Sequence, residues 1–385
     1  MPSGLRRVYF LKNAETLMLP FKSFKGRITS CSVPLGMQVV ETTLKEVSDN
    51  THGRNIDLIR VSSGTAVILG LDRGFLDAEP TTAYLLTFRK AKCTANCGFC
   101  PQARSSSGRA DMLSRVSWPV FAAGRVIPKL VASACSGKIG RICIQALNYP
   151  TVLEDLLVWI RKIKSAGSKV PISVACQPLN KWKMEKLAEA GVERAGIPLD
   201  AATKEVFDRV KGLGVDGPYD WQRQHEALLN AVEVFGRGQV STHLIVGLGE
   251  RDKDIIERIQ WCTNNGILPA LFSFTPIPGT ALEQFPQPPI SRYRRVQLGR
   301  HLIVKGKTTL ENMDFDENGC VISFGVSEKC LRSTVRSGLP FLTSGCPSCN
   351  RPYYNEKPSG PMYNFPKPPT PQQIKEIERD IKGKQ

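Results

Sequence analysis

The chain has 385 residues, of which 41 % are hydrophobic, and a net charge of +17. No stretch approaches about eighteen consecutive apolar residues, so the sequence predicts no membrane span. Lys12 and Glu15 interrupt the apolar region that a secretory signal needs. Twelve cysteines without such a signal indicate metal ligands and core thiols in a reducing, cytoplasmic compartment.

The net charge has three explanations. A strongly basic chain is the usual sign of nucleic-acid binding, but its field also attracts acidic proteins, and a charged surface by itself improves solubility. The basic residues are spread along the chain, and no Arg/Lys block is interleaved with aromatic residues. The charge alone therefore does not decide between these explanations.

Six β/α units follow an N-terminal extension, residues 1–80, to which we assign no role. The predicted strands are 82–88, 141–147, 171–176, 194–200, 240–247 and 270–274. The predicted helices are 118–134, 153–166, 181–190, 203–210, 221–235, 253–265 and 291–304. This alternation over residues 81–305 predicts a parallel sheet wrapped by helices, either doubly wound or an open six-stranded barrel. In both cases chemistry is expected at the C-terminal ends of the strands.

The alternation ends near residue 305, and residues 306–385 form a C-terminal extension. Nine prolines between residues 340 and 371 exclude most helix and central strand there. Such a segment is easier to order if metal ligation or docking on the barrel organises it. Thr370, Pro371 and Gln373 predict the N-cap, first turn and capping box of a final helix.

Cys93, Cys97 and Cys100 form a C-x3-C-x2-C triplet directly after the first predicted strand. Three thiolates hold three irons of a four-iron, four-sulfur cluster and leave one iron free to bind a small molecule. A zinc site would want a fourth nearby Cys or His, and none follows Cys100 for over thirty residues. The triplet resembles that of radical SAM enzymes, whose open iron binds S-adenosylmethionine. Phe99 matches the aromatic residue that such enzymes place beside the adenine.

Two cysteines lie on predicted strands. Cys143 and Gln145 share one parity, opposite to the apolar residues that would face the helices, so both are expected to point inward. Cys143 is therefore either a metal ligand or a small buried hydrophobe. Cys176 has the opposite parity and is expected to be a core thiol, unless its strand bulges.

Polar residues and glycines mark the ends of two further strands. Asp200 could accept hydrogen bonds from ribose hydroxyls, or it could cap the helix that starts near Thr203. Gly247 and Glu250 lie in a turn where the backbone could approach a ligand closely, although strand-to-helix turns use glycine in any case. His243 is interpreted as a core histidine, with catalysis as the alternative.

Cys346 and Cys349 form a second cysteine pair in the C-terminal extension. Zinc would need a further pair, for which Cys320 and Cys330 are upstream candidates. A thioredoxin-like redox role is disfavoured because no βαβ unit presents the pair at a helix N-terminus. Because the chain already has one cluster motif, we predict a second iron–sulfur cluster at this pair.

Residues 81–301 resemble radical SAM enzymes of the biotin-synthase-like group. The matching segments are the triplet, Arg-Ile-Cys143, Pro-Leu-Asp200, Ile-Val-Gly-Leu-Gly-Glu250 and residues 274–283. Within that group, three segments are similar to the archaeal-type two-component lipoyl synthases. These are residues 97–104, residues 196–201 and the tail Ser-Gly-Cys-Pro-Ser-Cys-Asn-Arg-Pro-Tyr-Tyr-Asn-Glu356.

The resemblance implies a partial (β/α)6 TIM-type barrel and sulfur insertion. A 5′-deoxyadenosyl radical made from S-adenosylmethionine would remove hydrogen from an octanoyl chain, and a second iron–sulfur cluster would donate sulfide. Phe99, Asp200, Gly247 and Glu250 would contact the cofactor. The implied partners are an octanoylated acidic carrier, which the positive charge would attract, a second radical SAM enzyme and an electron donor.

Some features depart from these families. The C-x4-C-x5-C motif of common bacterial lipoyl synthases is absent. Cys143 and Cys176 match two barrel cysteines of biotin synthases, but Ser241 occupies the third position. We therefore assign the second cluster to Cys346 and Cys349, with Cys143 as third ligand and Cys330 as its rival. The alternatives are a radical SAM enzyme acting on a free small molecule and a zinc-bound basic protein that binds nucleic acid.

Overall fold

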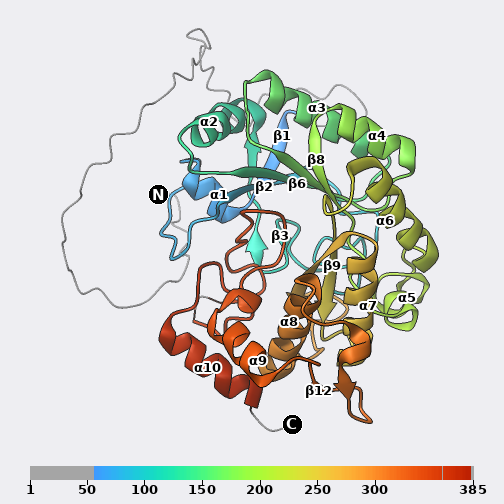
Figure 1. Ribbon diagram of the computed structural model, residues 1–385. Helices are drawn as coiled ribbons and strands as arrows, with labels where there is room; N and C mark the ends of the chain where they lie inside the picture. The colour runs from blue at the N-terminus through green and yellow to red at the C-terminus, as the bar shows by residue number, and fades with distance from the viewer. Residues whose placement is uncertain (1–55, 358, 383–385) are drawn as a thin grey trace, which may run out of the picture. The chain divides into compact units, whose positions relative to one another are not determined.

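A central sheet of six parallel strands organises the computed structural model, which describes residues 56–357 and 359–382 (Figure 1). The full sheet has eight strands in the order β10-β9-β8-β7-β6-β2-β1-β5. Its parallel strands are β2 (Thr82–Thr87), β6 (Arg141–Gln145), β7 (Ile172–Ala175), β8 (Val192–Gly196), β9 (Val240–Val246) and β10 (Ile267–Ser273). All six predicted strands are present, and the predicted parallel α/β class is confirmed. Among the described strands no ladder joins β10 to β5, so the sheet does not close into a full barrel.

Two antiparallel strands extend the sheet on the β2 side. β1 (Leu58–Val61) pairs with β2, and β5 (Val120–Ala122) pairs with β1. A short helix, α1 (Ser63–Ile68), connects β1 toward β2. The boundary predicted at residue 80 is therefore corrected, because residues 58–68 already belong to the sheet and its cover. Residues 1–55 lie outside the described part of the chain.

Helices follow the strands and cover one face of the sheet (Figure 1). They are α2 (Ala123–Cys135), α3 (Val152–Ser165), α4 (Lys181–Glu189), α5 (Lys204–Val210), α6 (Trp221–Phe235), α7 (Asp252–Asn264) and α8 (Ile290–Val304). The sequence of α3 favours a helix, because acidic residues occupy its first turn and lysines its last, and these charges stabilise the helix dipole. The helix predicted over 118–134 begins at Ala123, because residues 120–122 are extended and pair with β1.

The inner face of the sheet is set by strand parity. Ile142 and Ile144 of β6 are fully buried in the core shared with α3, whereas Cys143 and Gln145 alternate with them and remain partly exposed. Cys143 and Gln145 therefore face inward, as predicted.

The C-terminal extension contains more regular structure than expected. A hairpin of β11 (Asp314–Phe315) and β12 (Val321–Ser323) precedes an unpredicted helix, α9 (Glu328–Arg336). The final helix, α10 (Pro371–Lys382), is present, and the Thr370 amide donates to Gln373 Oε1 at 2.8 Å as the capping box predicts. The short remaining elements are β3 (Met112–Leu113), β4 (Val116–Ser117), η1 (Leu213–Val215), η2 (Leu310–Asn312) and η3 (Leu339–Phe341).

The irregular tail, residues 343–356, returns to the sheet. The Leu271 amide of β10 donates to Ser344 Oγ at 2.7 Å, and the Thr81 amide donates to Asn350 Oδ1 at 3.0 Å. These contacts tie the tail to both ends of the row of parallel strands. In the described residues no helix is long and apolar enough to cross a membrane.

Candidate active site and second cysteine group

The cysteine triplet lies in a loop that leaves the C-terminal end of β2. The Cys100 amide donates to the Cys97 carbonyl and the Cys93 amide to the Gln102 carbonyl, each at 3.0 Å. Lys92 Nζ donates to the carbonyls of Pro101 at 3.0 Å and Gly108 at 2.7 Å. The loop is thus shaped by its own backbone before any ligand binds.

Contacts across the loop attach it to two other β/α units. The Gly98 amide donates to the Val210 carbonyl at the end of α5, at 2.8 Å. The Gly98 carbonyl accepts from the Leu282 amide, in the segment that follows β10, at 3.0 Å. The loop therefore spans the top of the sheet instead of projecting into solvent.

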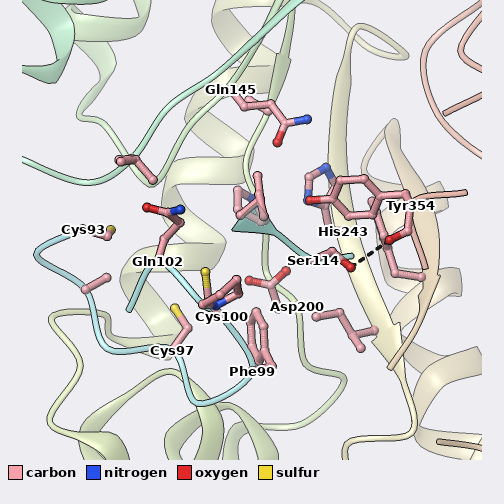
Figure 2. A pocket seen from close by; sticks show the side chains of 18 of the residues that line it. Cys93, Cys97, Phe99, Cys100, Gln102, Ser114, Gln145, Asp200, His243 and Tyr354 are labelled. Carbon is pink, nitrogen blue, oxygen red and sulfur yellow. Dashed lines mark hydrogen bonds between the residues drawn. The ribbon is translucent and has the colours of Figure 1, made fainter. Parts of the chain in front are cut away.

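The triplet borders a cavity at the C-terminal ends of the strands (Figure 2). Its lining includes all three triplet cysteines and residues from β6, β9, β10 and the tail. The predicted site residues in this wall are Cys93, Cys97, Phe99, Cys100, Asp200 and His243. Gln177 also lines the cavity, and its buried Oε1 has no hydrogen-bond partner among the described residues. This acceptor is available to a polar ligand.

Burial dominates the acid–base behaviour of two triplet cysteines, Cys97 and Cys100. It raises the pKa of Cys100 to about 12, with a smaller upward contribution from Cys93. The pKa of Cys97 is also raised by burial, and Lys211 opposes that rise. Binding a metal group, which takes thiolates, would therefore release protons from these side chains.

Asp200 is held rigidly in the cavity wall. Its φ is 69°, and its amide and carbonyl bond to the His243 carbonyl and the Ile245 amide of β9, each at 2.8 Å. Its Oδ2 lies 2.8 Å from Nζ of the fully buried Lys211. The helix-capping alternative is wrong, because Thr203 caps α5 by accepting from the Val206 amide at 3.3 Å. Asp200 lines the cavity, and its predicted contact with a cofactor stays a prediction.

Gly247 and Glu250 are placed differently. The Glu250 carboxylate accepts from the Gly247 amide at 2.8 Å and the Leu248 amide at 2.9 Å, and it pairs with Arg292 at 2.9 Å. Gly247 has a φ of 105°, and a Cβ there would lie 2.8 Å from Pro288. Neither residue is among the described residues that line the cavity. Their geometry is explained by the turn after β9, and their predicted contact with the cofactor stays a prediction.

His243 is an inward residue of β9 and not only a packing residue. It lines the cavity, and its ring lies 4.8 Å from that of Phe272. Burial lowers its pKa to about 4, Asp200 acts in the opposite direction, and Arg351 lowers it further. The imidazole is therefore neutral near pH 7.

Part of the chain is similar to known proteins. Residues 90–262 match the sequence profile of the radical SAM superfamily. The chain contains a radical SAM domain. Over 261 residues it is 23 % identical to biotin synthase of Chlamydia pneumoniae, covering 66 % of this chain and 72 % of that protein.

Two solved structures are similar to part of this chain. The FeFe-hydrogenase maturase from Carboxydothermus hydrogenoformans is 17 % identical, with a TM-score of 0.42 over 56 % of this chain and 49 % of that one. Methylornithine synthase is 12 % identical, with a TM-score of 0.47 over 63 % of this chain and 66 % of that one. The chain thus spans about half the length of the first structure.

The family implies a [4Fe-4S] cluster and S-adenosylmethionine, and the residues present fit them. Three thiols lie on one loop at the cavity edge, one ligand short of a full set. Phe99, Asp200 and the unpartnered Gln177 acceptor lie around the same cavity. The triplet would hold the cluster, and the cavity would hold the organic cofactor.

A second cysteine group, Cys143, Cys346 and Cys349, forms where the tail meets the inner face of this radical SAM domain. Cys143 lies beside Tyr84 of β2 and Ser173 of β7 in the sheet register. Tyr84 Oη lies 3.2 Å from Cys349 Sγ, and Ser173 Oγ lies 3.7 Å from Cys346 Sγ. The fold thus brings the strand cysteine to the tail pair, as predicted.

The pKa of Cys143 reflects the nearby tail thiols. Burial raises the pKa of Cys143, Cys346 and then Cys349 raise it further, and Arg351 lowers it. Cys330 instead lies in the first turn of α9, where its amide bonds to Ser327 Oγ at 3.3 Å. The structure therefore favours Cys143 over Cys330 as the third member.

Cys176 is buried, as expected of a core thiol, and burial raises its pKa to about 12. It also lines the cavity, although its strand parity predicted an outward direction. The β7–β8 ladder shifts register between Ile172 and Ser173, which breaks the simple alternation.

Several residues of the cavity and of the second cysteine group could not be identified from the sequence pattern around them. Tyr354 and Asn355 of the tail line the cavity, Lys211 of the α5 end pairs with Asp200, and Arg351 lies beside the second cysteine group. The tail motif was the only available pointer to Tyr354, Asn355 and Arg351. Lys211 had none.

Proposed function

We propose that this radical SAM enzyme inserts sulfur into protein-bound octanoyl groups, as one component of a two-component lipoyl synthase. The observation that carries the proposal is the second cysteine group, which lies on the inner face of the domain whose triplet borders the cavity. When bound, the triplet cluster and S-adenosylmethionine supply a 5′-deoxyadenosyl radical, and an iron–sulfur cluster on the second group supplies sulfide.

The cavity wall supports an acyl substrate. Apolar side chains from several strands and loops line it together with few polar groups. The apolar members include Leu86, Leu113, Ile245, Phe272 and Ile277. Such a wall accepts an octanoyl chain and excludes water from the reacting carbon.

The chain's own residues then have separate tasks. Cys93, Cys97 and Cys100 hold the first cluster, and Phe99 and Asp200 orient the organic cofactor. Cys143, Cys346 and Cys349 hold the second cluster. Tyr354, in the same tail as Cys349, lines the cavity, so the tail reaches both places.

The proposed partners follow from charge and chemistry. A net charge of +17 attracts an acidic carrier domain whose lysine bears the octanoyl group. A second radical SAM enzyme would install the other sulfur atom, and an electron donor would reduce the triplet cluster.

The test uses anaerobically reconstituted full-length protein, S-adenosylmethionine, a reductant and an octanoylated carrier peptide. Wild type is expected to form 5′-deoxyadenosine and a peptide heavier by sulfur, measured by mass spectrometry. The Cys346→Ala/Cys349→Ala variant is expected to retain cleavage and lose sulfur insertion. Cys330→Ala, a cysteine of the same extension, is the matched control and should behave as wild type. Sulfur insertion by the double variant would contradict the proposal.

A second candidate is a radical SAM enzyme acting on a free small molecule. The 23 % identity to biotin synthase favours it, whereas Ser241 at the position of a third barrel cysteine weakens a biotin-synthase assignment. The same assay with free octanoic acid and the octanoyl peptide in competition separates these candidates. Exclusive reaction of the free acid would replace the leading proposal by the second.

A further inference from the structure

Arg141, the first residue of β6, lies beside the second cysteine group. Its side chain is almost fully buried at the start of β6, and Nη1 donates to Ser173 Oγ at 2.8 Å. Nε donates to the Pro347 carbonyl between the two tail cysteines, at 3.4 Å. Since Ser173 Oγ also lies 3.7 Å from Cys346 Sγ, the guanidinium acts on that thiol through one hydroxyl.

Arg351 reaches the same group from the tail. Its amide donates to Tyr84 Oη at 3.0 Å, and that hydroxyl lies 3.2 Å from Cys349 Sγ. Its Nη2 donates to the Ser344 carbonyl at 3.2 Å, and its Cζ lies 3.9 Å from the ring centroid of Phe272. Because Phe272 lines the cavity, Arg351 lies between the cavity wall and the second cysteine group.

The tail backbone is strained where it places this arginine. Ser348, Arg351 and Tyr353 have φ values of 65°, 33° and 55°, a region that residues other than glycine rarely adopt. Strain of this kind persists only where surrounding contacts fix it, and it concentrates at functional sites. Here Asn350 supplies such contacts, with Oδ1 accepting from the Thr81 amide at 3.0 Å and Nδ2 donating to the Glu79 carbonyl at 2.8 Å.

Two cationic side chains lie beside the three thiols. Among the carboxylates of residues 56–357 and 359–382, none forms an ion pair with Arg351, although the buried Glu356 interacts with it electrostatically, and Arg141 pairs with the exposed Glu193. Burial disfavours negative charge on Cys143 and Cys349, and the two arginines act against that effect.

We propose that Arg141 and Arg351 are positioning residues that stabilise negative charge on the second cysteine group, with Ser173 and Tyr84 relaying hydrogen bonds to its sulfurs. The inference rests on the proposed function, since it concerns the iron–sulfur group that the three thiolates would hold. Positive charge and hydrogen bonds at the sulfurs stabilise the reduced form and raise the reduction potential. The arginines thus set the potential at which this group accepts an electron.

The test is a redox titration of the second group, followed by electron paramagnetic resonance, in wild type, Arg351→Gln, Arg351→Lys and Tyr84→Phe. Each is measured with and without alanine at the triplet cysteines, so that the two signals are separated. Arg258→Gln is the matched control, because this partly buried arginine packs against Trp221 and Trp261 on the helix-covered face. Iron content is measured on every sample.

Arg351→Gln is expected to lower the ratio of reduced to oxidised second group about tenfold at fixed potential, which is about 59 mV for one electron. Arg351→Lys should recover most of that shift, Tyr84→Phe should shift in the same direction by less, and Arg258→Gln should match wild type. Iron should stay at about eight per chain in all five proteins that have an intact triplet.

Other outcomes distinguish a failure of this inference from a failure of the proposed function. Eight irons with unchanged potentials in Arg351→Gln and Tyr84→Phe would overturn this inference and leave the proposed function intact. Loss of the second iron group in both Arg351→Gln and Arg351→Lys would show that Arg351 orders the tail and does not stabilise negative charge. That result would also overturn this inference. About four irons in wild type would overturn the inference and the proposed function together.

Discussion

The triplet and the second cysteine group reach similar chemistry by different constructions. The triplet, Cys93, Cys97 and Cys100, lies within one loop whose backbone hydrogen bonds are mostly local. The second group takes Cys143 from β6 and Cys346 and Cys349 from the tail, so only the folded sheet brings them together. A local group can be recognised from spacing alone, whereas an assembled group requires the fold.

Their surroundings differ in charge as well. Beside the triplet, the cation of Lys211 is already paired with the Asp200 carboxylate. Beside the second group, Arg351 forms no ion pair with any described carboxylate. The cation at the first site therefore has a direct carboxylate partner, and Arg351 at the second site does not.

The largest expected effect is on the triplet. Replacing any one of Cys93, Cys97 or Cys100 by alanine should reduce S-adenosylmethionine cleavage to background, because each thiolate holds one iron of the cluster. The measurement is 5′-deoxyadenosine formation by chromatography under anaerobic conditions. Cys330→Ala serves as control, and cleavage retained by all three variants would remove the cluster assignment.

The next effect distinguishes the two groups. Cys143→Ala should abolish sulfur insertion while leaving S-adenosylmethionine cleavage close to wild type, because it removes a ligand of the second group only. Cys262→Ala is the matched control, since that cysteine of α7 is buried in the core and is not among the described residues that line the cavity. Equal sulfur insertion by Cys143→Ala and wild type would return the third ligand to Cys330.

A stability effect tests the balanced charge beside the triplet. Lys211→Met leaves the buried Asp200 carboxylate unpaired and should cost about 3–5 kcal/mol of unfolding free energy. Lys211→Met/Asp200→Asn removes both charges and should recover much of that loss. Urea unfolding measures all three proteins. A single variant as stable as wild type would mean that the pair contributes nothing there.

The smallest effect concerns His243, whose pKa is lowered to about 4 by burial, while Asp200 and Arg351 act on it from the two regions in opposite directions. Since the folded pKa lies below the unfolded value of about 6.5, the neutral side chain contributes stability that is lost as pH falls from about 6.5 toward 4. His243→Gln should remove about 0.8 kcal/mol of the stability loss between pH 7.5 and pH 6. Thermal unfolding at both pH values gives this difference. An unchanged pH dependence would mean that the pKa of His243 is the same in the folded and unfolded states.

Much of the fold was predictable because its signals are local. The six strands and the inward parity of Cys143 follow from alternating apolar residues. The start of α2 was misjudged because residues 120–122 pair with β1, a contact distant in sequence. The short α9 lies beyond the part of the chain where helices and strands alternate, so that pattern did not reveal it.

The site was predictable only where one segment carries it. The triplet and Phe99 are contiguous, and the cavity contains all four. For Gly247 and Glu250 the sequence pattern was ambiguous, because a glycine-rich turn after a strand also serves packing. Lys211 acts through its ion pair with Asp200, and Arg351 acts through the path of the tail back to β2. Residue spacing shows neither contact.

The most direct measurement is iron and acid-labile sulfide content of full-length protein reconstituted without oxygen, in wild type and in Cys346→Ala/Cys349→Ala. The account predicts about eight irons in wild type and about four in the variant, because only the second group loses its ligands. About four irons in both proteins would contradict it and leave a radical SAM enzyme with a single cluster.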